Sequence, residues 1–400
     1  RWSKICIEVV MVVFFLHTVQ VQGTEIGMWD YIQSVRESSD FYEKEYVNPA
    51  KVKMTFPKEK KNLIYIFMES MESSYADKED GGTMDDNYIP NLTKLARENV
   101  QFTDKKDGKV GGPVCLEATA YTAGGLVAQT SAINLKVMNS GAVSDSFLPN
   151  LTALGDILNK QGYNQMFLCG SDGDFAGRDA YFKTHKDYQI EDYKAAIKEG
   201  DIPKDYKVYW GHEDKVLYER AKKNLKKLSK EGKPFNLTML TVDTHFPNGY
   251  ICDLCENKYD TTYGNAVACA DRQVYDFVQW IKKQDFYEDT TIIIAGDHTS
   301  MVDTGSKFWK SLSNDYQRTV YNAIINPQCA YKKKVTTKRK FSTMDMFPTT
   351  LAALGVEIDG NKLGLGTNLF SGEETLREEL GANYINKELK RNDKMYNQFY

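Results

Sequence analysis

Short apolar runs alternate with longer mixed stretches over most of the chain, and this alternation predicts the fold. Near-continuous apolar or β-branched runs occur in NLIYIFMES, YNQMFLCGS, FNLTMLTVD and TIIIAGDH. Such runs are typical of parallel strands that are buried on both faces. The stretches between them are predicted to be helices. The predicted fold class is therefore α/β, an α/β/α sandwich with a largely parallel central sheet.

The same pattern predicts one large domain over residues 61–372. Within it, NLTKLARENVQF and TMDMFPTTLAALGVEI should each form a helix followed by a strand, and TAYTAGGLVAQTSA should form a helix. Residues 373–400 are polar, so we expect them to form an exposed helix or tail.

The N-terminal residues differ in character from the rest. Residues 1–22 are apolar from Ile5 to Val21, with Arg1 and Lys4 at one end, and we interpret them as the end of a transmembrane helix. Residues 23–60 would then be a juxtamembrane segment, and the domain after it would be extracytoplasmic. Glu8 and His17 interrupt the apolar run, so a signal peptide or a buried helix are the alternatives.

The charge balance gives no support to a nucleic-acid-binding function. The chain has 51 basic and 55 acidic residues and a net charge of -4, which does not favour a nucleic-acid partner. A basic run, AYKKKVTTKRKF, is predicted as an exposed hairpin or strand edge. In a membrane-attached protein the same run could instead contact anionic lipid headgroups.

Seven cysteines are present, and three of them lie close together in the sequence. Cys252, Cys255 and Cys269 lack a fourth soft ligand nearby, so a zinc site is disfavoured. In an extracytoplasmic domain, a disulfide from Cys269 to either Cys252 or Cys255 is the better interpretation.

Polar groups follow three of the predicted strands. Glu69 ends the first, Asp243 and His245 follow the third, and Asp297 and His298 follow the fourth. Because parallel strands present their carboxyl ends at one edge of a sheet, these side chains should meet there. Taken singly, each is more often a helix cap, an ion pair or a structural hydrogen-bond donor. Taken together, carboxylates and imidazoles are what a divalent metal site requires.

The segment GGPVCLEATAYTAGGLVAQTS offers a nucleophile. Thr119 is predicted at a helix N-terminus, where free backbone N–H groups and the helix dipole attract a phosphate or sulfate. A metal-coordinated hydroxyl at that point can attack phosphorus. The alternative is that Thr119 only caps the helix. Thr122 is the competing candidate, but one turn inside the helix its hydroxyl would bond a backbone carbonyl.

These residues resemble a known family. YIFMESMESSY, EATAYTAGGLVAQ, GSDGDFAGRDAYFKTH, VDTHFP, CADRQV and IIIAGDH occur in the order found in the membrane-anchored phosphoglycerol transferases. That group includes glucan-modifying enzymes and lipoteichoic acid synthases, within the sulfatase and alkaline phosphatase-like superfamily. The resemblance runs from about residue 60 to about residue 370, and GLGLGTNLFSG is more similar to the glucan-modifying branch. Around Cys115 the chain reads CLEAT, which does not match the modified nucleophile motif of sulfatases.

The resemblance implies a role for each candidate residue. Glu69, Thr119, Asp297 and His298 would surround one manganese or magnesium ion, with Thr119 as nucleophile. Arg178 and His245 would hold the phosphoglycerol headgroup. The implied extracytoplasmic enzyme moves phosphoglycerol from phosphatidylglycerol to a hydroxyl of an envelope glycan at the membrane, releasing diacylglycerol.

Two alternative functions stay open. The first is a phosphoethanolamine transferase or a metal-dependent phosphodiesterase that uses the same nucleophile. The second is a non-catalytic module that binds glycans or lipid headgroups.

Overall fold

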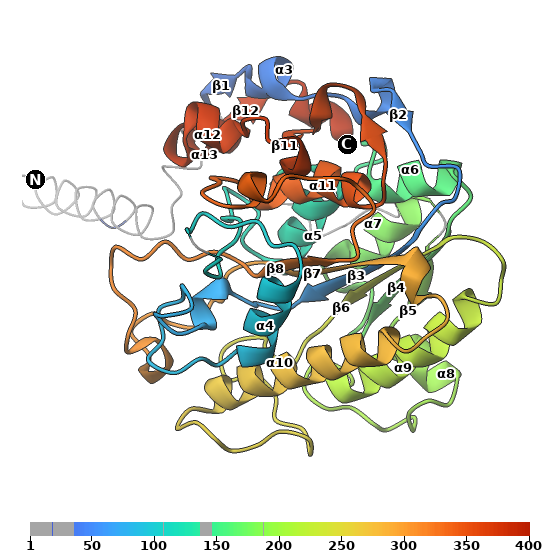
Figure 1. The fold of residues 1–400 in the computed structure, drawn as a ribbon, viewed down its shortest axis with the longest axis vertical. Helices are drawn as coiled ribbons and strands as arrows, with labels where there is room; N and C mark the ends of the chain where they lie inside the picture. Colours follow the sequence, from blue (N-terminus) through green and yellow to red (C-terminus); the bar gives the residue numbers. More distant parts are fainter. Residues whose placement is uncertain (1–17, 19–35, 107, 137–145, 187) are drawn as a thin grey trace, which may run out of the picture.

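The computed structural model describes residue 18 and residues 36–106, 108–136, 146–186 and 188–400 (Figure 1). The predicted transmembrane helix therefore lies almost entirely outside the described residues. Among the residues that are described, no helix combines the length and apolar character needed to cross a membrane.

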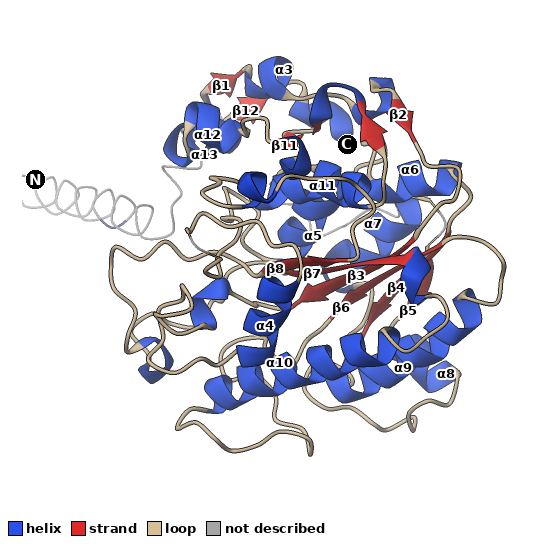
Figure 2. Cartoon of the chain, viewed as in Figure 1, coloured by secondary structure: helices blue, strands red, loops and turns tan. Residues whose placement is uncertain are grey.

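A six-stranded sheet forms the centre of the molecule (Figure 2). Its strands, in spatial order, are β5 (Gln189–Glu191), β4 (Asn164–Cys169), β6 (Phe235–Leu240), β3 (Asn62–Met68), β7 (Thr290–Gly296) and β8 (Asn322–Ile325). All neighbouring pairs are parallel except β7 and β8, which are antiparallel. This confirms the predicted α/β class with a largely parallel sheet.

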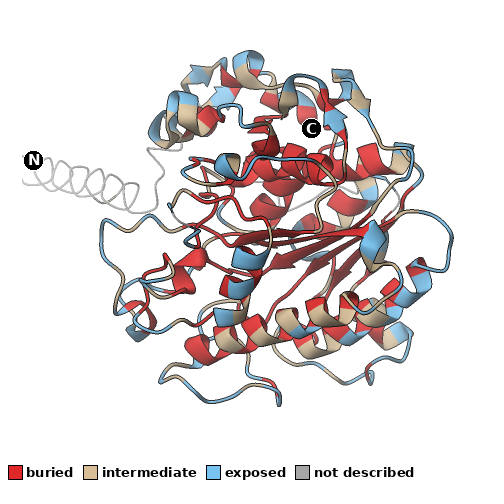
Figure 3. Cartoon of the chain, in the orientation of Figure 1, coloured by how far each residue is buried: buried red, intermediate tan, exposed pale blue. Residues whose placement is uncertain are grey.

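Helices cover both faces of the sheet (Figure 1). On one face lie α5 (Thr122–Ser131), α6 (Leu154–Lys160), α7 (Arg178–Thr184) and α11 (Met346–Ala353). On the other lie α4 (Pro90–Glu98), α8 (Tyr193–Lys198), α9 (Asp214–Leu228) and α10 (Thr262–Ile281). Side chains of β3 alternate between the two cores: Tyr65 and Phe67 point into one, and Ile64 and Ile66 into the other. Burial on both faces explains why the strand has no polar alternation (Figure 3).

Two local predictions were wrong. The expected strand at Val100 is an isolated bridge to Ile324. The basic run contains a 3-10 helix, Lys333–Thr336, rather than a hairpin or strand edge. The predicted helix and strand near residue 350 are confirmed: α11 is followed by β9 (Glu357–Ile358), which pairs with β2 (Met54–Thr55) outside the central sheet.

The cysteine pairing is now defined. Cys255 and Cys269 form a disulfide that ties the loop before α10 to that helix. Cys252 is a buried free thiol whose Sγ lies 3.6 Å from Cys255 Sγ.

The C-terminal residues pack into the domain rather than extending from it. They form α12 (Leu376–Leu380), α13 (Ala382–Lys390) and β12 (Asn392–Asp393), and β12 pairs in parallel with β1 (Ser38–Ser39). A further small hairpin joins β10 (Lys362–Leu363) to β11 (Gly366–Thr367). The expected helix is therefore present, but the segment is not a free tail, because Leu376, Ile385, Leu389, Tyr396 and Phe399 are buried against the core.

The two ends of the described chain meet around Tyr42, in α3 (Phe41–Glu45). The Tyr42 ring is buried, with its centroid 5.2 Å from that of Tyr396 and 5.8 Å from that of Phe399. Its backbone N–H donates to Asp393 Oδ2 at 3.0 Å, and its hydroxyl donates to Asn134 Oδ1 at 2.6 Å. The second half of the predicted juxtamembrane segment thus belongs to the folded domain.

Replacing Tyr42 by alanine should lower the free energy of unfolding by about 3 kcal/mol, since a buried aromatic ring leaves a cavity. Tyr42→Phe keeps the ring and should cost about 1 kcal/mol for the lost hydrogen bond. Urea unfolding of both variants measures these changes in the free energy of unfolding. If truncation after Gly372 leaves the unfolding midpoint unchanged, the C-terminal residues do not stabilise the core.

Candidate active site

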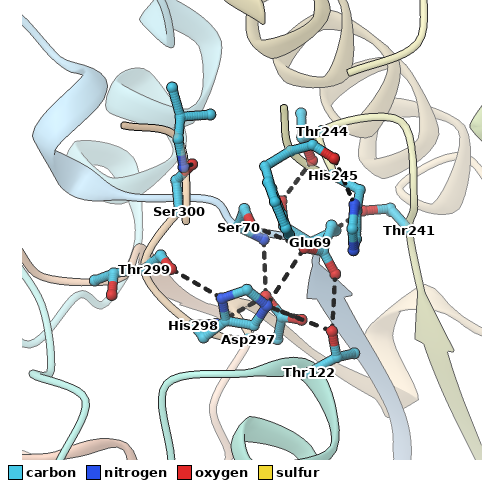
Figure 4. Close-up of polar contacts among 12 residues, drawn as sticks. Glu69, Ser70, Thr122, Thr241, Thr244, His245, Asp297, His298, Thr299 and Ser300 are labelled. Atoms are coloured by element: carbon cyan, nitrogen blue, oxygen red, sulfur yellow. Dashed lines mark hydrogen bonds and ion pairs between the residues drawn. The ribbon is translucent and has the colours of Figure 1, made fainter. Parts of the chain in front are cut away.

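Two neighbouring strands bring three predicted residues together. Glu69 follows β3, and Asp297 and His298 follow β7 (Figure 4). His298 Nε2 lies 3.3 Å from Glu69 Oε1 and 3.5 Å from Asp297 Oδ2. All three side chains are buried, and each offers a ligand atom within 4.8 Å of the others.

Backbone contacts set the direction in which each group points. Asp297 Oδ1 accepts hydrogen bonds from the backbone N–H of Ser70 at 2.8 Å and of His298 at 2.7 Å. The other oxygen, Oδ2, is buried and has no hydrogen-bond partner among the described residues. His298 Nδ1 lies 2.9 Å from the carbonyl oxygen of Thr299, which turns Nε2 toward the carboxylates (Figure 4).

The three groups perturb one another strongly. Burial raises the pKa of Asp297 to about 8, and the nearby Glu69 carboxylate adds to this shift. Burial alone would also raise the pKa of Glu69, but the positive charge of His298 outweighs it and lowers that pKa to about 2. Burial opposes the charged form of His298, yet Asp297 and Glu69 raise its pKa to about 10. Two carboxyl groups held this close favour a bound positive charge.

The donor set fits a divalent cation. Two carboxylates and an imidazole are oxygen and nitrogen ligands that manganese, magnesium and zinc accept. Asp297 Oδ2 is a buried acceptor that lies 3.5 Å from His298 Nε2 but accepts no hydrogen bond among the described residues, and such atoms normally have a hydrogen-bond donor or a metal beside them. The cluster of Glu69, Asp297 and His298 is therefore a candidate divalent metal site.

The hydroxyl that completes this cluster belongs to Thr122. Thr122 Oγ1 lies 3.2 Å from Glu69 Oε2 and 3.4 Å from His298 Nε2. Thr119 is fully buried, and its hydroxyl donates to the carbonyl oxygen of Leu116 at 2.9 Å and accepts from Thr343 at 3.5 Å. The structure places Thr122, and not Thr119, at the cluster, which corrects the predicted fourth ligand.

The start of α5 explains this correction. The helix begins at Thr122, three residues later than predicted, so Thr122 and not Thr119 lies at the helix N-terminus. Gly125 lets the helix approach β7 closely, because a Cβ at this position would lie 2.2 Å from the carbonyl oxygen of Asp297. Gln129 Nε2 donates to the carbonyl oxygen of Gly296 at 2.9 Å and holds the two elements together.

A cavity of about 200 Å³ opens beside Glu69 and Thr122. Arg178 lines it and is almost fully buried. The Arg178 guanidinium donates to Ser171 Oγ at 3.0 Å and to the carbonyl oxygens of Asp172 at 2.8 Å and Phe175 at 3.0 Å. These three bonds fix the guanidinium at the cavity wall, where it can bind an anionic ligand.

His245 lines the same cavity from the loop after β6. Its Nδ1 lies 2.8 Å from the carbonyl oxygen of Phe246, which leaves Nε2 for a ligand. The Tyr209 hydroxyl donates to the carbonyl oxygen of His245 at 2.6 Å, and the Trp210 ring centroid lies 5.0 Å from that of His245. The structure thus brings both predicted ligand-binding residues, Arg178 and His245, to the cavity beside Thr122.

Asp243 does not join the metal cluster. Its Oδ2 accepts from the backbone N–H of Asp214 at 3.2 Å, while Asp214 accepts from the backbone N–H of Val242 at 2.8 Å and of Asp243 at 3.2 Å. Burial raises the pKa of Asp214 to about 7 and that of Asp243 to about 9. This pair joins the end of β6 to the start of α9 and supports the loop that carries His245.

Several further residues that line the cavity were not identified from the sequence, among them Ser171, Asp172, Phe175, Lys207 and Trp210. Lys207 and Trp210 lie in the segment KVYWG, which has neither strand nor helix periodicity. The only local signal is a tryptophan outside any predicted element, where burial in a core does not explain it.

Comparison with known proteins gives relatives along most of the chain. The sulfatase family model matches residues 61–356. Phosphoglycerol transferase I of Salmonella choleraesuis is 33% identical over 340 residues, which is 82% of this chain and 41% of that protein. The same-named protein of Shigella flexneri has the same identity and coverage. The chain thus spans about two fifths of the length of these curated relatives.

Solved structures share the fold. The lipoteichoic acid synthase LtaP of Listeria monocytogenes superposes with a TM-score of 0.61 at 19% identity, covering 80% of this chain and 79% of that one. An alkaline phosphatase superfamily protein of Vibrio parahaemolyticus gives 0.59 at 21% identity, covering 82% and 75%. The zinc complex of the EptC periplasmic domain from Escherichia coli gives 0.55 at 14% identity, covering 79% and 88%.

These similarities confirm the predicted alkaline phosphatase and sulfatase-like fold. The matched region contains the candidate metal cluster, Thr122 and the cavity residues. Because the family model covers most of its length, the chain belongs to the sulfatase family.

Proposed function

We propose that this chain transfers sn-glycerol 1-phosphate from phosphatidylglycerol to a hydroxyl of a cell-envelope glycan, releasing diacylglycerol. The transfer would pass through a covalent glycerophospho-threonine at Thr122. The observation that carries the proposal is the position of the Thr122 hydroxyl, between Glu69 and His298 and facing the cavity of Arg178 and His245. The names of the curated relatives support the class of reaction.

Glu69, Thr122, Asp297 and His298 would hold one divalent ion, which we propose to be Mn²⁺, with Mg²⁺ as the alternative. When bound, the ion supplies positive charge that neutralises phosphate oxygens and lowers the pKa of a coordinated hydroxyl. Glu69 Oε2 accepts the hydrogen bond of Thr122 and orients its hydroxyl toward the cavity.

The remaining groups act on the phosphodiester. Thr122 Oγ1, at the N-terminus of α5, releases its proton to water and attacks phosphorus, and the P–O bond to diacylglycerol breaks as the new P–O bond forms. The backbone N–H groups of that helix end favour the anionic headgroup. Arg178 binds a phosphate oxygen through its guanidinium. His245 Nε2 donates a proton to the departing diacylglycerol oxygen, and in the second half of the reaction it accepts the proton of the incoming hydroxyl.

We place this activity on the outer side of the membrane. The Cys255–Cys269 disulfide supports that location, because disulfides persist in oxidising compartments. The membrane would supply phosphatidylglycerol as the donor, and the envelope glycan would be the acceptor.

Thr122→Ala should reduce diacylglycerol release from labelled phosphatidylglycerol by about a thousandfold or more, because the nucleophile is lost. Thr119→Ala is the matched control and should retain activity within about threefold, since it loses hydrogen bonds to Leu116 and Thr343 but no contact with the cluster. Mass spectrometry of the quenched wild-type enzyme should find the glycerophosphoryl group on the Thr122 peptide.

Loss of activity in Thr119→Ala with retention in Thr122→Ala would return the nucleophile to Thr119. Release from phosphatidylethanolamine but not from phosphatidylglycerol would reject the donor and support a phosphoethanolamine transferase.

Asp297→Asn should weaken Mn²⁺ binding by about a hundredfold, because one of two anionic ligands is removed. In the wild type, Mn²⁺ at about 100 times its Kd should stabilise the fold by about 2.7 kcal/mol relative to the chelated protein. Calorimetric titration and thermal melts with Mn²⁺ or EDTA measure both effects.

Asp243→Asn is the matched control for this test. It makes the same substitution at a buried carboxyl outside the cluster, whose raised pKa already keeps it protonated. It should retain the Mn²⁺ response. Equal Mn²⁺ affinity of Asp297→Asn and wild type would show that the ion binds elsewhere.

A further inference from the structure

We propose that Phe175 and Trp210 form an aromatic platform that seats a neutral sugar ring of the acceptor at the mouth of the cavity. The inference rests on the proposed function for the reaction in which the acceptor takes part. Phe175 is 56% exposed and Trp210 is 40% exposed, and their ring centroids lie 5.5 Å apart. In the described part of the chain, they are the only exposed large apolar side chains that line the cavity of Glu69 and Thr122.

The local backbone conformation and the contacts of Arg178 hold Phe175 in its exposed position. Phe175 begins a 3-10 helix, Phe175–Gly177, in which Ala176 has a φ of 56° and Gly177 a φ of 71°. A left-handed conformation is unfavourable for alanine, so its neighbours must hold it. Arg178 does so: its Nε donates to the carbonyl oxygen of Phe175, and its guanidinium carbon lies 5.4 Å from the Phe175 ring centroid. The side chain proposed to bind phosphate therefore also fixes one ring of the platform.

Trp210 contacts His245 on the other wall of the cavity. Its ring centroid lies 5.0 Å from that of His245, and the preceding Tyr209 bonds the carbonyl oxygen of His245. The platform thus joins the residue that binds phosphate to the residue that exchanges a proton with the entering hydroxyl. A sugar resting on both rings would present its hydroxyls next to His245.

The surroundings of the platform favour a sugar over a lipid chain. Asp172 and Asp174 flank Phe175 and pair with Lys194 at 3.4 Å and 2.8 Å, and Lys207 lines the cavity. Covering these charges with acyl chains would remove their hydration without replacing it. A sugar ring offers C–H groups on its face for the aromatic rings and hydroxyls at its edge for carboxylates and ammonium groups. Since charges of both signs lie beside the rings, a neutral sugar fits better than an anionic one.

The geometry of the second transfer step also favours a sugar bound at the platform. A hydroxyl of the seated sugar attacks phosphorus of the glycerophospho-Thr122 and forms a new P–O bond, while the P–O bond to Thr122 Oγ1 breaks. His245 Nε2 takes the hydroxyl proton, and Thr122 Oγ1 takes back from water the proton that it released in the first half of the reaction, so atoms and charge balance. In-line attack requires the sugar to enter opposite Thr122, from the side open to the platform.

Direct binding tests the platform without any transfer reaction. The probe is a neutral glucose hexasaccharide, titrated into the full chain by calorimetry and by tryptophan fluorescence. Phe175→Ala and Trp210→Ala should each weaken binding at least about fivefold, and Phe175→Tyr and Trp210→Phe should largely restore it. Tyr384→Ala is the control, because Tyr384 is 48% exposed on α13 and does not line the cavity. Equal affinity of wild type and the double alanine variant would overturn the proposal.

Transfer kinetics give the second readout. In the alanine variants, KM for the hexasaccharide should rise at least about fivefold more than KM for phosphatidylglycerol. If the variants instead lose binding to phosphatidylglycerol vesicles and keep hexasaccharide binding, the platform contacts lipid and the proposal fails. If the wild type binds the hexasaccharide through Phe175 and Trp210 but transfers nothing to it, the sugar site stands and the proposed function is rejected.

Discussion

The parallel pairing of β3 with β7 is the constraint on which the rest of the site depends. In this register Met68 lies beside Gly296, so the next residues, Glu69 and Asp297, leave the sheet at the same edge. No flexible loop is needed to bring their carboxylates together. A divalent site built on two central strands inherits the rigidity of the sheet, which suits ligands that must keep a fixed geometry.

Such a site has an electrostatic cost that its neighbours must offset. Two carboxyl groups with little solvent beside them repel one another, and burial together with the nearby Glu69 raises the pKa of Asp297, whereas the positive charge of His298 lowers that of Glu69. Backbone N–H groups of Ser70 and His298 stabilise one oxygen of Asp297, and His298 supplies the opposite charge. The remaining oxygen of Asp297 is left for a cation. The cluster is therefore arranged for charge binding rather than for folding stability.

The residues that face the cavity are held by loops rather than by the central sheet. Arg178 and His245 lie on loops beyond the strands, but each is held by bonds to backbone carbonyl oxygens. Phe175 contacts Arg178 and Trp210 contacts His245, so the aromatic surface and the polar cavity are continuous. This arrangement separates a candidate metal site at the edge of the sheet from a cavity surface on loops, and loops can vary in sequence without disturbing the strands that support them.

The sequence by itself determined the α/β class, the four central strands, and the meeting of Glu69, Asp297 and His298. Each of these follows from local patterns, because buried parallel strands are apolar throughout and end at one edge. Only the tertiary structure shows that Thr122 rather than Thr119 lies beside the cluster, since the close approach of Gly125 to Asp297 defines where α5 lies against the strand end. It also decided that Cys255 rather than Cys252 pairs with Cys269, that Trp210 reaches the cavity, and that the polar C-terminal residues pack around Tyr42. These outcomes depend on contacts between residues far apart in the chain, which local patterns do not encode.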